Sequence, residues 1–151
     1  MIARRLRSAA EPPVNSRIGE AISSFARPLH EFEDLDPLMD RIGDARFVLL
    51  GEASHGTAEF YDWRRLISQR LIREKNFSFI AVEGDWPDCY RVNRYVKGYS
   101  DSGKDAHEVL HAFKRCPTWM WANREVVALA NWLRRHNASM PENKKVGFYG
   151  L

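Results

Sequence analysis

Ionisable side chains directly follow two apolar runs of this sequence. Residues 46–50 lead into Glu52 and His55, and residues 77–82 lead into Glu83. Apolar runs rich in β-branched and aromatic residues and stopped by glycine predict strands buried on both faces. A helix-length segment separates the two runs, which predicts a β-α-β unit with parallel strands. We therefore expect these side chains to meet at the sheet edge where open α/β sheets bind ligands.

The loop at residues 51–57 precedes the crossover helix predicted at residues 58–75. Backbone N–H groups at a helix N-terminus carry partial positive charge, so this loop is suited to hold an anion or a developing oxyanion. Ser54 also lies in the loop. It lacks the Gly-x-Ser-x-Gly sequence that exposes a nucleophilic serine, so we do not assign it that role.

The spacing of apolar residues in the rest of the chain predicts an α/β fold, with a parallel sheet of at least three strands flanked by helices. The third strand is expected at residues 146–151, and further helices at residues 16–28, 34–42, 88–96, 106–115 and 124–136. We divide the chain into a tail with a short helix, residues 1–33, and an α/β part, residues 34–151. The last strand ends at the predicted site, so we expect a fragment of a longer enzyme. Its uncovered edge would favour self-association.

Composition narrows the class of protein. The chain has 151 residues, 44% hydrophobic and 28% charged, with a net charge of +3. This is typical of one globular domain, and the basic excess is too small to indicate a nucleic-acid partner. No apolar run reaches the ~20 residues that span a bilayer. Cys89 and Cys116 form no metal-binding or disulfide pattern, so we expect a cytoplasmic protein.

Several motifs together resemble the erythromycin esterase family. They are the Gly-Glu-Ala-Ser-His-Gly-Thr loop at 51–57, the Val-Glu-Gly-Asp-Trp-Pro turn at 82–87, residues 91–96, the Pro-Thr-Trp-Met-Trp-Ala-Asn segment at 117–123, and residues 146–151. The resemblance runs from about Leu35 to Leu151. It implies an α/β hydrolase for a small-molecule ester or lactone, without a cofactor, whose resistance members open macrolide antibiotics. It also implies a histidine from a C-terminal half that this chain does not contain.

The resemblance carries over to individual residues. His55 would be the general base that activates water, because the unperturbed pKa of histidine suits that task at neutral pH. Glu52 would orient the His55 ring, and Glu83 would hold the water or the substrate. Arg64 would pair with a carboxylate or face the oxyanion. The candidate substrate-binding residues are Trp86, Trp119, Trp121 and Asn123.

Three other interpretations concern metal ions and inactivity. Glu52, His55 and Glu83 also suit a divalent metal, which would make a metal-dependent hydrolase. Alternatively, the chain is a non-catalytic truncated remnant. His107 and His111 fit the bare His-Glu-x-x-His pattern of zinc proteases, but their predicted helix is short and no third ligand is evident, so we do not adopt that interpretation.

Overall fold

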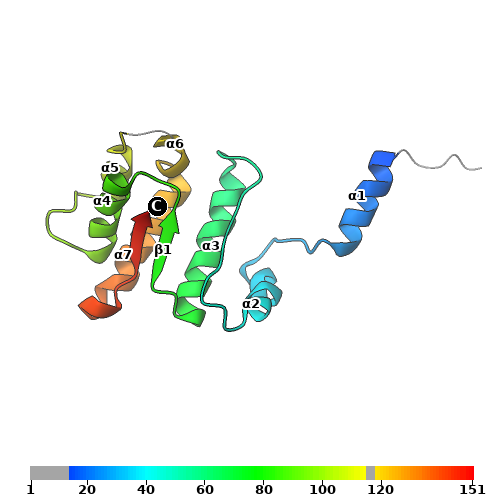
Figure 1. Ribbon diagram of the computed structural model, residues 1–151, viewed down its shortest axis with the longest axis horizontal. Coiled ribbons are helices and arrows are strands. Elements are labelled where there is room, and N and C mark those ends of the chain that lie inside the picture. Colours follow the sequence, from blue (N-terminus) through cyan, green and yellow to red (C-terminus); the bar gives the residue numbers. More distant parts are fainter. Residues whose placement is uncertain (1–13, 115–117) are drawn as a thin grey trace, which may run out of the picture. The chain divides into compact units, whose positions relative to one another are not determined.

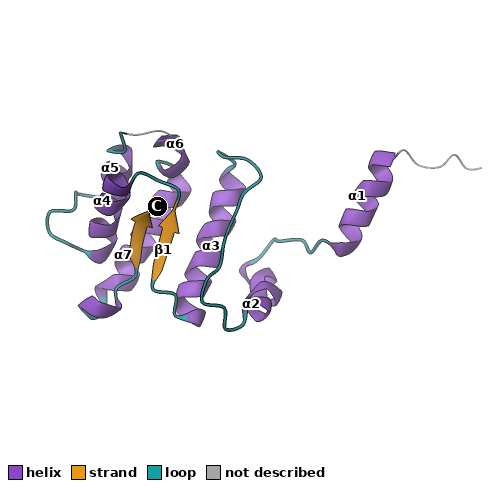
Figure 2. Ribbon diagram, viewed as in Figure 1, coloured by secondary structure: helices purple, strands orange, loops and turns teal. Residues whose placement is uncertain are grey.

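The computed structural model describes residues 14–114 and 118–151 (Figure 1). They fall into two compact units, one ending at Asp36 and the other beginning at Pro37. Figure 2 shows the secondary structure. The elements are α1 (Val14–Phe25), η1 (Phe32–Leu35), α2 (Asp36–Ile42), α3 (Ala58–Lys75), β1 (Phe79–Val82), α4 (Trp86–Lys97), α5 (Ala106–His111), α6 (Thr118–Trp121), α7 (Arg124–Ala138), η2 (Glu142–Lys144) and β2 (Gly147–Gly150).

The first unit contains α1 and η1. The apolar side chains of α1, Ile18, Ile22 and Phe25, are all exposed. Asp34 lies within η1, and its carboxylate accepts hydrogen bonds from the backbone N–H groups of Glu31 and His30, which precede that element. Those bonds stabilise the charged form and lower the pKa of Asp34. The local turn before η1 is therefore fixed by a side-chain cap.

The second unit is an α/β arrangement built on β1 and β2, which pair in parallel with Phe79 opposite Gly147 and Val82 opposite Gly150. Helix α4 packs along β2 and against α7, and α7 also packs against α3 and α5. Large apolar side chains from these elements form one core, including Val92, Leu110, Leu133 and Phe148. The strand predicted at residues 146–151 is confirmed.

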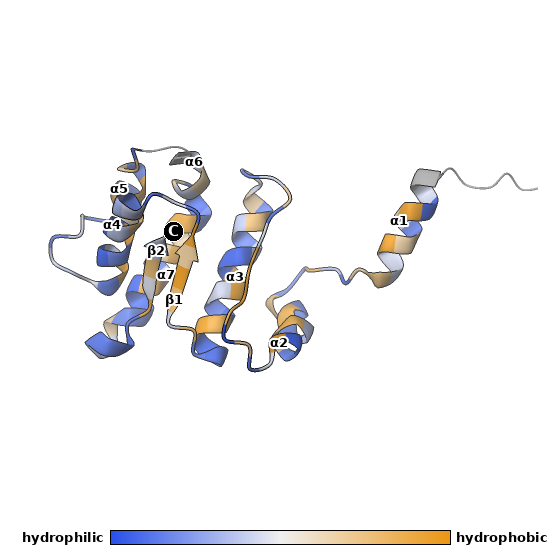
Figure 3. Cartoon of the chain, viewed as in Figure 1, coloured by the Kyte–Doolittle hydropathy of each residue, from blue (hydrophilic) through white to orange (hydrophobic). Residues whose placement is uncertain are grey.

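The strand predicted at residues 46–50 is not formed. Residues 47–50 have no regular secondary structure, and Phe47 and Leu49 are 77% and 95% exposed. In the described part of the chain, β1 pairs with β2 alone, so residues 46–50 form no ladder with β1. Figure 3 colours the chain, including this apolar segment, by hydropathy. Phe79 and Ala81 are also exposed, so β1 is not buried on both faces as predicted. A strand of this type requires a covering layer on each face, and no described element supplies it here.

Two side chains bond to backbone groups on the outer edge of β2, the edge at which self-association was expected. Asn93 of α4 accepts a hydrogen bond from the Phe148 N–H at 3.0 Å. Asn137 of α7 accepts from the Val146 N–H at 2.8 Å and donates to the Val146 carbonyl at 2.9 Å. These bonds engage three of the backbone groups that an added strand would use.

Candidate active site

The carboxylate of Glu52 joins His55 and Arg64. Its Oε1 lies 2.5 Å from His55 Nδ1, and its Oε2 accepts a hydrogen bond from Arg64 Nη2 at 2.6 Å. The Glu52 side chain is 5% exposed, whereas the His55 side chain is 50% exposed. A buried carboxylate therefore holds an imidazole that reaches solvent. With Nδ1 carrying its proton toward Glu52, His55 Nε2 keeps a free lone pair.

Two neighbouring elements hold this pair in place. Glu52 and His55 are three residues apart in the loop that enters α3 at Ala58, and Arg64 lies in the second turn of that helix. Gly56, next to His55, has a φ of +87°, a backbone conformation that favours glycine. The chain thus turns sharply after His55, so that α3 brings Arg64 back to Glu52.

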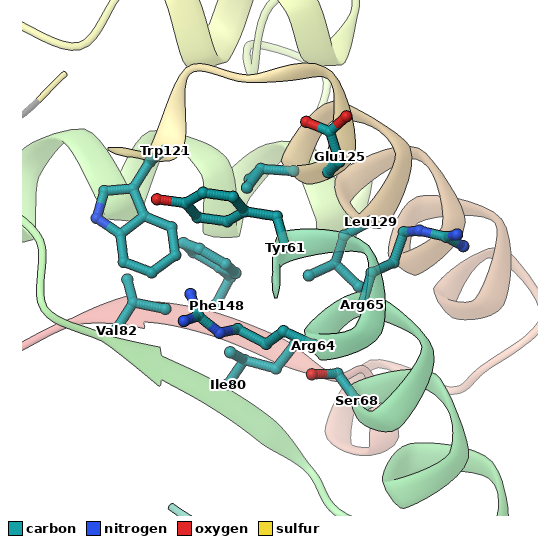
Figure 4. Close-up of a pocket in the computed structure, with 11 residues that line it drawn as sticks. Tyr61, Arg64, Arg65, Ser68, Ile80, Val82, Trp121, Glu125, Leu129 and Phe148 are labelled. Carbon is teal, nitrogen blue, oxygen red and sulfur yellow. The ribbon is translucent and has the colours of Figure 1, made fainter. Parts of the chain in front are cut away.

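The guanidinium of Arg64 lies over two aromatic rings. Its Cζ lies 5.3 Å from the centre of the Tyr61 ring and 5.9 Å from that of Trp121. These distances are typical of cation–π contacts. Figure 4 shows the three side chains at a pocket whose apolar walls come from the sheet and α7, including Val82 and Phe148. Arg64 therefore pairs with a carboxylate, the first of its two predicted roles.

Trp121 links this array to the end of β1. Its Nε1 donates a hydrogen bond to the Glu83 carbonyl at 2.8 Å, and its side chain is buried. A Cβ on Gly84 would lie 3.2 Å from Trp121 Nε1 and 2.8 Å from Cys89 Sγ. The close fit requires glycine at this turn and brings the end of β1 to the side of Arg64.

The carboxylate of Glu83 stands apart from the Glu52 array. Glu83 is exposed, and within the described residues no hydrogen bond or ion pair joins its side chain to Glu52, His55 or Arg64. The hydrogen bond from Trp121 to the Glu83 carbonyl holds the main chain of Glu83 in place. The carboxylate is left free to contact water or a ligand.

The remaining candidate residues divide by exposure. Trp119 is 53% exposed, and its ring centre lies 6.1 Å from that of His55 in an edge-on arrangement. Trp86 is 57% exposed and stacks on Tyr90. Asn123 caps the N-terminus of α7 by accepting the Val126 N–H at 2.9 Å. Trp119 is thus an exposed aromatic beside His55, whereas Asn123 has a clear structural contact.

No metal-binding group is formed by the candidate ligands. Within residues 14–114 and 118–151, no three His, Cys, Asp or Glu side chains come together as a potential metal site. His107 and His111 are exposed on α5 and stack on each other, with ring centres 3.9 Å apart. Cys116 lies outside the described residues.

Comparison with known proteins assigns the chain to a family. The model of the erythromycin esterase family matches residues 72–151, more than half of the chain. The chain belongs to the erythromycin esterase family. It is 27% identical over 124 residues to erythromycin esterase type II of Escherichia coli, covering 82% of this chain. It spans only 27% of that relative's length, about a quarter.

Two solved structures support the α/β arrangement of this erythromycin esterase family member. One, described as a succinoglycan biosynthesis protein, is 29% identical with a TM-score of 0.72. The match covers 94% of this chain and 35% of that protein's chain. The other, a Bacillus cereus protein, is 27% identical with a TM-score of 0.70. Here the match covers 92% of this chain and 33% of the Bacillus cereus chain.

The match to the erythromycin esterase model begins after Glu52, His55 and Arg64 and includes Glu83. The assignment of the first three residues to a site therefore stands on their own geometry. One further residue of that geometry, Tyr61, was missed by the sequence analysis. A buried tyrosine on an amphipathic helix is typical of core packing. Only the contact of its hydroxyl with the Gly56 N–H, at 3.4 Å, links Tyr61 to the His55 loop.

Proposed function

We propose that this protein hydrolyses a carboxylic ester or lactone of a small molecule, using water activated by His55. The observation that carries the proposal is the Glu52 carboxylate held between His55 Nδ1 and Arg64. A carboxylate on one imidazole nitrogen fixes the tautomer whose other nitrogen accepts a proton. Family membership independently favours ester hydrolysis.

In the proposed reaction, His55 Nε2 takes a proton from water as the water oxygen bonds to the ester carbonyl carbon. The carbonyl π electrons move to oxygen and form a tetrahedral oxyanion. When the C–O bond to the alcohol breaks, the protonated His55 returns its proton to the leaving oxygen. Glu52 stabilises the charged imidazole in between, as a carboxylate does in hydrolytic triads.

Other residues are assigned supporting roles. Arg64 holds Glu52 in place and neutralises it in a site where an unpaired buried carboxylate would be costly. The exposed carboxylate of Glu83 is proposed to bind the attacking water or a substrate hydroxyl. The exposed ring of Trp119 is proposed as a wall for the substrate beside His55. Macrolide lactones are one candidate substrate, on the strength of the family name.

A panel of esters and macrolide lactones, offered to the full-length protein in ¹⁸O-labelled water, tests the proposal. We expect turnover that a chelator does not reduce, with one ¹⁸O in the acid product in a single turnover. Label appearing first in a protein carboxylate would indicate a covalent carboxylate intermediate. Loss of turnover with chelator, restored by added metal, would instead support the metal-dependent alternative.

A further inference from the structure

We propose that Tyr61 is a further catalytic residue, whose hydroxyl donates a hydrogen bond to the substrate carbonyl oxygen as it becomes an oxyanion. This inference rests on the proposed ester hydrolysis and adds a residue to it. Tyr61 lies on the first turn of α3, between the loop that carries His55 and the guanidinium of Arg64.

The hydroxyl has an unused donor. Its oxygen accepts the N–H of Gly56, the residue after His55, at 3.4 Å. Because that N–H points at the oxygen, the phenolic proton must point elsewhere, and among the described residues no acceptor for it is present. The Tyr61 side chain lines the pocket beside Trp121, and its hydroxyl points toward the Trp121 side (Figure 4).

The surroundings keep this donor in place and protonated. The ring is 4% exposed and packs against the Arg64 guanidinium, so its orientation is set before a substrate arrives. Burial raises the pKa of Tyr61, the nearby Glu52 carboxylate raises it further, and the Gly56 hydrogen bond and Arg64 act in the opposite direction. At the pH where histidine acts as a base, the hydroxyl is therefore a donor and not a competing base.

The proposed reaction makes use of such a donor. When water adds to the carbonyl, negative charge develops on an oxygen that His55 does not contact, since His55 is occupied with the proton of the water. Arg64 Nη2 is engaged with Glu52, and the Tyr61 hydroxyl is a neutral side-chain donor beside the same loop. No proton is transferred by Tyr61: the hydrogen bond strengthens as charge forms and weakens when the tetrahedral intermediate collapses.

Tyr61→Phe tests this role, because it removes the hydroxyl and keeps the ring over Arg64. The full-length protein is assayed with the ester it hydrolyses fastest, and binding of the corresponding methylphosphonate monoester, an anionic mimic of the intermediate, is measured. We expect kcat to fall about 100-fold, phosphonate affinity to fall by at least tenfold, and KM to change less than threefold. Tyr95→Phe is the matched control, since Tyr95 is equally buried and its hydroxyl donates to Asn131.

A second variant covers the case in which Tyr61→Phe does not fold. Replacement of Tyr61 by 3-fluorotyrosine keeps the hydroxyl and the shape but lowers the phenol pKa. If the protonated hydroxyl is the donor, the alkaline loss of kcat moves to lower pH. An unchanged alkaline limb, or a kcat of Tyr61→Phe within threefold of the parent, overturns the inference. If His55→Ala retains activity, the proposed function itself fails, which is a separate result.

Discussion

Arg64 Nη2 donates to Glu52 Oε2 at 2.6 Å, and both side chains are largely withdrawn from solvent. The pair lies at the centre of the site because the other oxygen of Glu52 contacts His55. The guanidinium also contacts the rings of its neighbours Tyr61 and Trp121. Arg64 thereby connects the His55 loop to the turn that follows β1.

We expect Arg64→Ala to lower the free energy of unfolding by about 2–4 kcal/mol, because it leaves the Glu52 carboxylate buried without its cationic partner. Arg64→Lys keeps the charge but loses the planar contacts with the two rings, and should fall between. Arg65→Ala is the matched control on the same helix, since Arg65 pairs with a well-exposed Asp62 and should cost about 1 kcal/mol or less. Urea unfolding of the three variants measures their free energies of unfolding. An Arg64→Ala variant as stable as Arg65→Ala would contradict the structural role given to the Arg64–Glu52 pair.

Asn137→Ala is predicted to cost about 2–4 kcal/mol in the free energy of unfolding. The fully buried side chain hydrogen-bonds the Val146 N–H, the Val146 carbonyl and the Val96 carbonyl, and its removal leaves these backbone groups unsatisfied. Ser139→Ala, at the exposed end of α7, should change the value by less than about 0.5 kcal/mol. Equal unfolding midpoints for the two variants would show that Asn137 does not fix the β2 edge.

The sequence predicted local relationships better than long-range ones. Glu52 and His55 meet because they are three residues apart in one loop. The role of Arg64 was implied by the family resemblance, and its bond to Glu52 spans 12 residues of chain. Residues 46–50 have the composition of a buried strand, yet composition does not reveal whether a neighbouring layer is present to bury them. The contact of Tyr61 with Gly56 could not be predicted either, because the sequence does not indicate where the Tyr61 hydroxyl points.

The Cys89 thiol should resist alkylation in the folded protein. Burial, followed by the charges of Asp88 and Asp85, raises the pKa of Cys89 to about 12. The nucleophilic thiolate is therefore scarce at pH 8. In a Cys116→Ser background, iodoacetamide should label Cys89 only after urea unfolding. Labelling of the native protein as fast as that of the unfolded chain would contradict the assignment.

Cys89 also predicts an alkaline effect on stability. The folded state keeps the proton that the unfolded chain loses above its ordinary pKa of 9.0. The free energy of unfolding should therefore decrease as the pH rises from about 9 toward 12. Cys89→Ala should reduce this slope, even though the substitution itself lowers stability by leaving a small cavity. An unchanged slope would show that another group causes the alkaline loss.

His136 predicts a loss of stability in acid. Burial, and then the charge of Arg73, lower the pKa of His136, which stacks on Trp132. The unfolded chain therefore binds a proton more readily, so stability should fall as the pH drops below about 6.5, the ordinary value. In the His136→Gln variant, the unfolding midpoint should change less between pH 6.5 and 5 than in the parent. His107→Gln, at an exposed position, should keep the parental pH dependence. The reverse pattern would contradict the prediction.

Hydrolysis by a His55→Ala variant, with and without added imidazole, tests whether His55 is the general base. With the preferred ester, the variant should lose at least about 100-fold in kcat/KM, while its unfolding midpoint stays near that of the parent. Free imidazole should then restore part of the rate, because it supplies the missing base in the space that the side chain vacates. A folded His55→Ala protein that hydrolyses the ester at the parental rate would contradict the assignment of His55 as the general base.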